Sequence, residues 1–161
     1  MTTIGAITPP HTDYAEVALR PLEPERAALI VIDIQEKLLP PIFQKEHLVR
    51  NSQLLIRLAG VLKIPTLLTT QYSKGLGNTV ILCGMESHIC VAQTALAALR
   101  AGYLVHVASD AVSSRTEWNR NTGLERMRAA GAVISSTEMI IYEALKSSST
   151  SEFKTMLQYL K

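Results

Sequence analysis

Two residues whose types could act together in nucleophilic chemistry each follow an apolar run of the sequence. Cys90 comes five residues after VILCGM at 80–85, at the start of a predicted helix. The N-terminus of a helix lowers the pKa of a thiol through its free N–H groups and its dipole, so this position favours a thiolate. Asp33 directly follows the run AALIVI at 27–32 and could accept the thiol proton. The pair predicts a cysteine nucleophile with a carboxylate base.

Each of these residues also has a purely structural interpretation. Cys90 could be a small apolar residue at a helix start, and Asp33 could cap a helix formed by QEKLL at 35–39. Cys83 lies inside its apolar run and is interpreted as a core residue, and the two cysteines do not have C-x-x-C spacing. His88 could pair with Cys90, although a role in orienting the backbone of the turn fits its position better.

Strands and helices that alternate along the chain must position these side chains. Apolar runs predict strands at 27–33, 65–69, 80–84, 103–109 and 132–136, and helical spacing predicts helices at 47–62, 88–101, 119–130, 137–146 and 152–160. This alternation predicts an α/β fold with a mostly parallel sheet. Ligands bind beyond the carboxyl ends of such strands. The rule points to Asp33, 69–74, 84–90 and Asp110.

The connection between the second and third predicted strands is unusually short. Only TQYSKGLGNT at 70–79 lies between them, without helical periodicity. Parallel neighbours need a crossover of roughly a dozen residues or more, usually with a helix. Either these two strands are not neighbours in the sheet, or a segment is absent between about 77 and 80. We favour an absent segment.

Composition and charge exclude several classes of protein. The chain has 161 residues, which fits one domain at 27–161 preceded by a proline-rich arm at 1–26. Its net charge of +2 comes from scattered basic residues, which argues against nucleic acid as a partner. No apolar run has the roughly 18 residues that a membrane helix needs, and the N-terminus is unlike a secretory signal. The sequence predicts a cytoplasmic protein without a membrane partner.

Four motifs together resemble the isochorismatase-like cysteine hydrolase superfamily. The resemblance covers roughly residues 27–145 and is carried by ALIVIDIQEKLLP, TTQYSKGLG, VILCGMESHICVAQTALAALRAGYLVHVASDAVSSR and LERMRAAGAVISSTEMIIYEAL. The third motif is most similar to the isochorismatase domain-containing proteins. The resemblance implies a three-layer α/β/α sandwich, Rossmann-like, with a parallel sheet of about six strands.

The resemblance also implies an Asp–Lys–Cys triad. The family aspartate falls on Asp33 and the family cysteine on Cys90. The family's non-proline cis peptide falls on Met85–Glu86, and the N–H groups of Glu86 and Cys90 would form the oxyanion hole. The triad lysine has no match, because the stretch that carries it in the family is the one missing here. Lys74 belongs to a different motif.

These inferences lead to a prediction of function. We expect a hydrolase that cleaves an amide-type C–N bond of a small molecule through a Cys90 thiolate and a thioester. No histidine pair has metal-ligand spacing, so neither a metal nor another cofactor is expected. The family implies a homodimer or a larger homo-oligomer. The alternative is a catalytically impaired family member that serves as an interaction or regulatory module.

Overall fold

A five-stranded sheet forms the centre of the molecule. The computed structural model describes residues 16–17, 19–68 and 77–160. The strands are β1 (Ala27–Ile32), β2 (Thr66–Leu67), β3 (Thr79–Met85), β4 (Leu104–Ser113) and β5 (Val133–Ser135). Their order is β2-β1-β3-β4-β5, and every adjacent pair is parallel. The parallel α/β fold is confirmed, with five described strands where the family resemblance implies about six.

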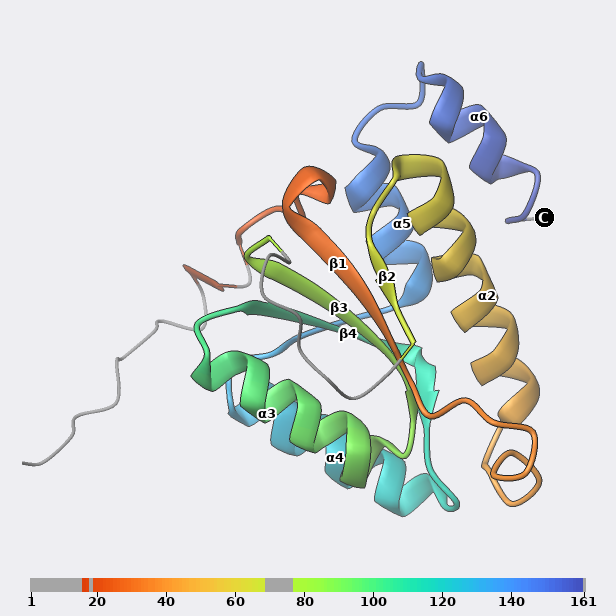
Figure 1. The fold of residues 1–161 in the computed structure, drawn as a ribbon, viewed down its shortest axis with the longest axis vertical. Coiled ribbons are helices and arrows are strands. Elements are labelled where there is room, and N and C mark those ends of the chain that lie inside the picture. The colour runs from red at the N-terminus through yellow and green to blue at the C-terminus, as the bar shows by residue number, and fades with distance from the viewer. Residues whose placement is uncertain (1–15, 18, 69–76, 161) are drawn as a thin grey trace, which may run out of the picture.

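Helices cover both faces of this sheet (Figure 1). The regular helices are α2 (Lys45–Leu62), α3 (Ala92–Arg100), α4 (Glu117–Ala129), α5 (Thr137–Leu145) and α6 (Ser151–Leu157). A 3-10 turn, η1 (Pro24–Arg26), precedes β1, and a π-helix, η2 (Ser87–Val91), follows β3. Figure 1 shows α2 and α5 on one face and α3 and α4 on the other, so the expected three-layer sandwich is present. None of the helices in the described part of the chain is long and apolar enough to cross a bilayer.

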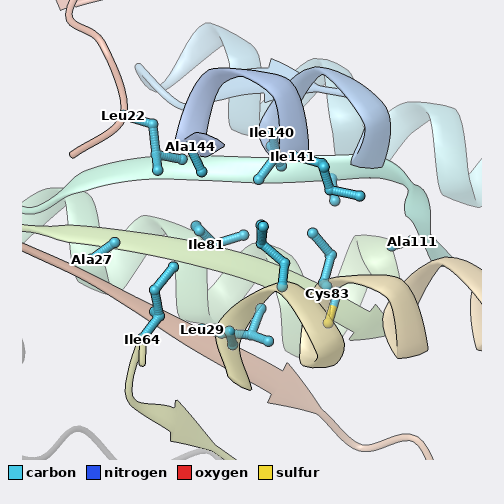
Figure 2. Packing of buried hydrophobic residues seen from close by; sticks show 14 of the residues in the cluster. Leu22, Ala27, Leu29, Ile64, Ile81, Cys83, Ala111, Ile140, Ile141 and Ala144 are labelled. Carbon is cyan, nitrogen blue, oxygen red and sulfur yellow. The ribbon is translucent and has the colours of Figure 1, made fainter. Parts of the chain in front are cut away.

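The central strands are buried on both faces, which explains their continuous apolar sequences. All residues of β1 and β3 are buried. Because side chains alternate between faces, Leu29 of β1 packs with Ile81 and Cys83 of β3 beneath α5, while Ile30 of β1 packs toward α3. Figure 2 shows the first of these clusters, with Ile141 of α5 above the strands.

The sheet order bears on the short connection at 70–79. Both β2 and β3 pair with β1, which therefore lies between them. The two strands are not neighbours, so strand pairing by itself does not require an absent segment. The absent segment remains a prediction, and its support is now the missing lysine motif alone. Residues 69–76 lie outside the described part of the chain.

The last part of the N-terminal arm packs against the domain. Leu22 is fully buried, and its backbone N–H donates to Oε1 of Glu143 on α5 at 2.7 Å. This hydrogen bond joins the arm to the layer formed by α2 and α5.

His106 of β4 is a buried histidine on the face of the sheet that α2 and α5 cover. It is 1% exposed, and neither ring nitrogen has a hydrogen-bond partner within the described residues. Burial lowers the pKa of His106, and the charge of Glu143 opposes this shift only in part. The unfolded chain, in which the pKa of this histidine is about 6.5, therefore binds a proton more readily than the folded protein does. As the pH falls below about 6.5, protonation of His106 lowers the free energy of unfolding, and above that pH His106 causes no such loss.

We therefore expect His106→Leu to stabilise the protein. Removing two unpaired buried nitrogens should add about 1 kcal/mol to the free energy of unfolding at neutral pH. The variant should also lose less stability than the wild type between about pH 7.5 and 5.5. Urea unfolding across this range measures both effects, with exposed His47→Gln as the control. Parallel pH dependences for wild type and His106→Leu would contradict the assignment.

Candidate active site

Asp33 lies at the carboxyl end of β1, on the edge that the sequence indicates. Ile32 pairs with Gly84 of β3, so Asp33 lies beside the end of the neighbouring central strand. Its backbone is left-handed, with φ of 48°. The residues after it form turns, and α2 begins only at Lys45. The alternative interpretation of Asp33 as a cap for a helix at 35–39 is therefore wrong.

Cys90 is the fourth residue of η2, which continues directly into α3. The single helix expected at 88–101 is thus two segments, a π-helical one followed by an α-helical one. The Cys90 side chain is half-buried, and Asp33 is near enough to its thiol to raise the thiol pKa through hydrogen bonding and charge. The structure accordingly brings together the two side chains that the sequence proposes as nucleophile and base.

The environment of Cys90 raises the pKa of its thiol. Burial is the largest cause, followed by the hydrogen bond to Asp33 and the negative charge of Asp33. A backbone hydrogen bond from Glu86 lowers the pKa, while the charge of the Glu86 carboxylate raises it. The lowered pKa expected from a helix N-terminus is therefore wrong in direction. Asp33 therefore favours the protonated thiol over the thiolate.

Cys83 is more deeply buried than Cys90. It is fully buried within β3, and burial raises the pKa of its thiol to about 12. The structural interpretation of Cys83 is confirmed. Thiolates rather than thiols are the nucleophiles, so Cys90 is the more reactive of the two cysteines.

Glu86 joins the cysteine turn to the loop after β4. The peptide bond between Met85 and Glu86 is cis. The Glu86 carboxylate accepts hydrogen bonds from Nε of Arg115 at 3.0 Å and from its backbone N–H at 3.2 Å. Sequence reasoning did not identify Arg115, because nothing in its local sequence signals a contact with a residue 29 positions earlier.

A second connection runs through Ser114, which is fully buried. Its hydroxyl lies 3.0 Å from Nδ1 of His88, and its carbonyl oxygen accepts the N–H of Phe43 at 2.9 Å. This contact with Ser114 fits the interpretation in which His88 orients the turn. The end of β4 therefore joins the loop that follows Asp33 to the turn that carries Cys90.

The remaining sequence candidates have other roles or positions. Asp110 lies within β4, and its Oδ1 accepts the backbone N–H of Thr137 at 2.7 Å and the hydroxyl of Thr137 at 2.8 Å, which fixes the start of α5. Lys74 and its neighbours at 71–72 lie outside the described residues.

Comparison with known proteins decides the family. The family model described as "Isochorismatase domain" matches residues 74–139. The secreted isochorismatase effector Isc1 of Phytophthora sojae is 32% identical to this chain, over 87% of this chain and 87% of its own length. The chain belongs to the isochorismatase family. Isochorismatase domain-containing protein 2B of Mus musculus is also 32% identical, over 91% of this chain and 87% of its own.

Solved structures of the isochorismatase fold agree with the architecture. The MAR1 ribonuclease structure from Caenorhabditis elegans has a TM-score of 0.81 and 31% identity, covering 88% of this chain and 92% of its own. The YcaC gene product of Escherichia coli, an octameric hydrolase of unknown specificity, has a TM-score of 0.78 at 20% identity, covering 86% of this chain and 90% of its own. Membership of the isochorismatase family supports a hydrolase.

The alignment with the isochorismatase relative from P. sojae extends over 182 positions, which exceeds the 161 residues of this chain. That relative therefore has residues without a counterpart here.

A hollow formed by described residues of this isochorismatase-family chain is lined by neither of the two candidate catalytic side chains. Its volume is about 550 Å³, and it lies between the loop after Asp33 and the first half of α2, where Leu39, Lys45 and Arg50 contribute to its wall. Neither Asp33 nor Cys90 lines it. Within the described ranges, no three His, Cys, Asp or Glu side chains come together as metal ligands.

Proposed function

We propose that this protein is a cysteine hydrolase that cleaves an amide-type C–N bond of a small molecule. The proximity of the Asp33 carboxylate to the Cys90 thiol, which raises the pKa of that thiol, is the observation that supports the proposal. A thiol whose pKa is raised needs a base in contact with it at the moment of attack, and Asp33 fills that position.

The proposed reaction has two halves. Asp33 takes the thiol proton while the sulfur of Cys90 attacks the substrate carbonyl carbon, and the N–H groups of Glu86 and Cys90 stabilise the oxyanion. Asp33 returns the proton to the leaving nitrogen as the C–N bond breaks, which leaves a thioester on Cys90. Asp33 then takes a proton from water, the hydroxide attacks the thioester, and the acid is released as the thiol is restored.

A specific observation also favours a second candidate, a catalytically impaired member that serves as an interaction or regulatory module. No cation among residues 16–17, 19–68 and 77–160 contributes to the pKa of Cys90. The triad lysine of the family, which would lower that pKa, has no match in the sequence. In this case the thiol stays protonated and turnover is absent.

We further propose that the protein acts in the cytoplasm as a homodimer or a larger homo-oligomer, without nucleic-acid or membrane partners. The octameric E. coli neighbour supports self-association. The P. sojae relative is described as secreted, so location needs a direct test. Light scattering and fractionation of cells that express the untagged chain provide these tests.

The hydrolase proposal is tested by a substrate panel and two matched cysteine variants. We expect hydrolysis of one or more small amides or N-carbamoyl compounds and none of an RNA oligonucleotide, which is included because of the name of the C. elegans neighbour. Cys90→Ser should reduce the rate by about a thousandfold or more, because a carboxylate cannot activate a serine hydroxyl as it does a thiol. Cys83→Ser is the control and should keep most of the activity.

Intact-protein mass spectrometry should detect the thioester on the wild type and on Cys83→Ser only. Full activity in Cys90→Ser would overturn the proposed chemistry. No turnover of any amide, by a protein whose Cys90 still reacts with iodoacetamide, would support the module instead. Cleavage of RNA that persists in Cys90→Ser would assign the activity to a different site.

A further inference from the structure

The helix α4 touches the cysteine turn through its backbone at Gly123. A Cβ atom added to Gly123 would lie 2.7 Å from both the carbonyl carbon and the oxygen of Ser87, and 2.8 Å from the backbone nitrogen of His88. All three are backbone atoms, which cannot rotate away as the end of a side chain can. Only glycine therefore allows α4 and η2 to approach as closely as they do.

Local structure gives no reason for a glycine at this position. Gly123 lies in the interior of α4, where glycine costs roughly 1 kcal/mol relative to alanine. Its φ is not in the left-handed region, unlike that of Gly131 after the helix end. The close approach to η2 is thus the feature that explains glycine here.

The atoms that Gly123 contacts belong to the segment that determines the reactivity of Cys90. Ser87 and His88 lie between Glu86, whose backbone forms a hydrogen bond with the thiol, and Cys90 itself. Ser87 is fully buried, and its hydroxyl has no hydrogen-bond partner within the described residues. Packing against α4, rather than a side-chain hydrogen bond of Ser87, therefore holds this side of the turn.

We propose that Gly123 is a positioning residue of the Cys90 site. Its missing side chain lets α4 support the turn, and this support keeps the sulfur of Cys90 in contact with both Asp33 and the Glu86 backbone. The contact between His88 and Ser114 adds a second support, from the residue that follows β4. The inference rests on the proposed function in one respect, that Cys90 is the reacting group.

The test compares Gly123→Ala with Gly60→Ala. Gly60 is also inside a helix, and a Cβ there would meet nothing within 4 Å, so Gly60→Ala is a matched control. The main readout is the rate of Cys90 alkylation by iodoacetamide as a function of pH, measured on the intact full-length chain. Protection of buried Cys83 in the same spectra shows that each variant is folded.

We expect Gly123→Ala to move the pH profile of Cys90 downward. Displacing the turn moves the thiol away from Asp33, whose hydrogen bonding and charge both raise the pKa of that thiol. At about pH 7.5 alkylation should become roughly threefold faster, because a lower thiol pKa leaves more thiolate at that pH. Hydrolysis of any amide that the wild type accepts should fall about tenfold or more, because the same displacement separates nucleophile and base.

The outcomes separate this inference from the proposed function. A shifted profile in a protein without hydrolase activity supports the positioning role and not the hydrolase. A Gly123→Ala profile that coincides with those of wild type and Gly60→Ala overturns the inference, even if the melting temperature falls. Reaction of Cys83 in Gly123→Ala would mean that this variant is unfolded. In that case the pH profile of Cys90 alkylation in Leu124→Ala provides the test. Leu124 is 7% exposed and anchors α4 in the core beside Gly123, and an unchanged profile in this variant overturns the inference.

Discussion

Asp33→Asn is expected to make Cys90 more reactive toward iodoacetamide and, at the same time, to abolish hydrolysis. The hydrogen bond and the charge of Asp33 both raise the pKa of the Cys90 thiol. Removing the charge moves that pKa toward its ordinary value, so more thiolate is present near neutral pH and alkylation is faster. Hydrolysis also needs Asp33 as the proton acceptor and donor, and loss of a general base typically costs about a hundredfold to ten-thousandfold.

The opposite signs make this prediction specific. Alkylation quenched at set times and read by mass spectrometry measures the reactivity of Cys90. Release of product from the best amide in the panel measures hydrolysis. Glu36→Gln removes an exposed carboxylate three residues further along the same loop and should leave both rates unchanged. Slower alkylation of Asp33→Asn would show that Asp33 does not oppose ionisation of the thiol, and retained hydrolysis would exclude it as the base.

Gly84→Ala is expected to have the largest effect on stability. Gly84 has φ of 123°, and a Cβ there would lie 2.1 Å from the carbonyl oxygen of Ile32 on β1. The side chain would be forced between the two central strands, next to Asp33. Strain and overpacking together should lower the free energy of unfolding by about 4 kcal/mol or more.

Urea unfolding tests this expectation, with Gly102→Ala as the matched control. Gly102 also has a positive φ, of 85°, but a Cβ there would meet nothing within 4 Å. Gly102→Ala should lower the free energy of unfolding by only about 1–2 kcal/mol, because only the left-handed backbone opposes alanine there. Equal losses in the two variants would mean that close approach to Ile32 contributes nothing to the requirement for glycine at 84.

The parts of the fold that the sequence predicts are those set by burial along single elements. The runs that became β1 and β3 are apolar throughout because helices cover both faces of the sheet. The proximity of Asp33 and Cys90 follows from the same strand pattern, because the carboxyl ends of parallel strands lie on one edge of the sheet. Both inferences need only the type of each element and not its exact boundaries.

The features that the sequence does not predict depend on contacts between distant segments. The pKa of Cys90 is raised because burial and Asp33 outweigh the local effect of a helix start, and neither magnitude can be read from the residues around Cys90. Asp110 contacts Thr137, which is 27 residues away. Gly123 gives no sequence signal beyond being a glycine within a helical pattern, so its contact with Ser87 required the structure.

The lengths of the strands have a consequence for how copies of this chain could meet. The outermost described strands are the shortest, with two residues in β2 and three in β5, while the strands inside have six, seven and ten. Open edges expose backbone N–H and C=O groups that recruit other strands and promote aggregation, and short edges limit this hazard. Among the described elements, the short edge strands therefore disfavour association of two molecules by extension of the sheet.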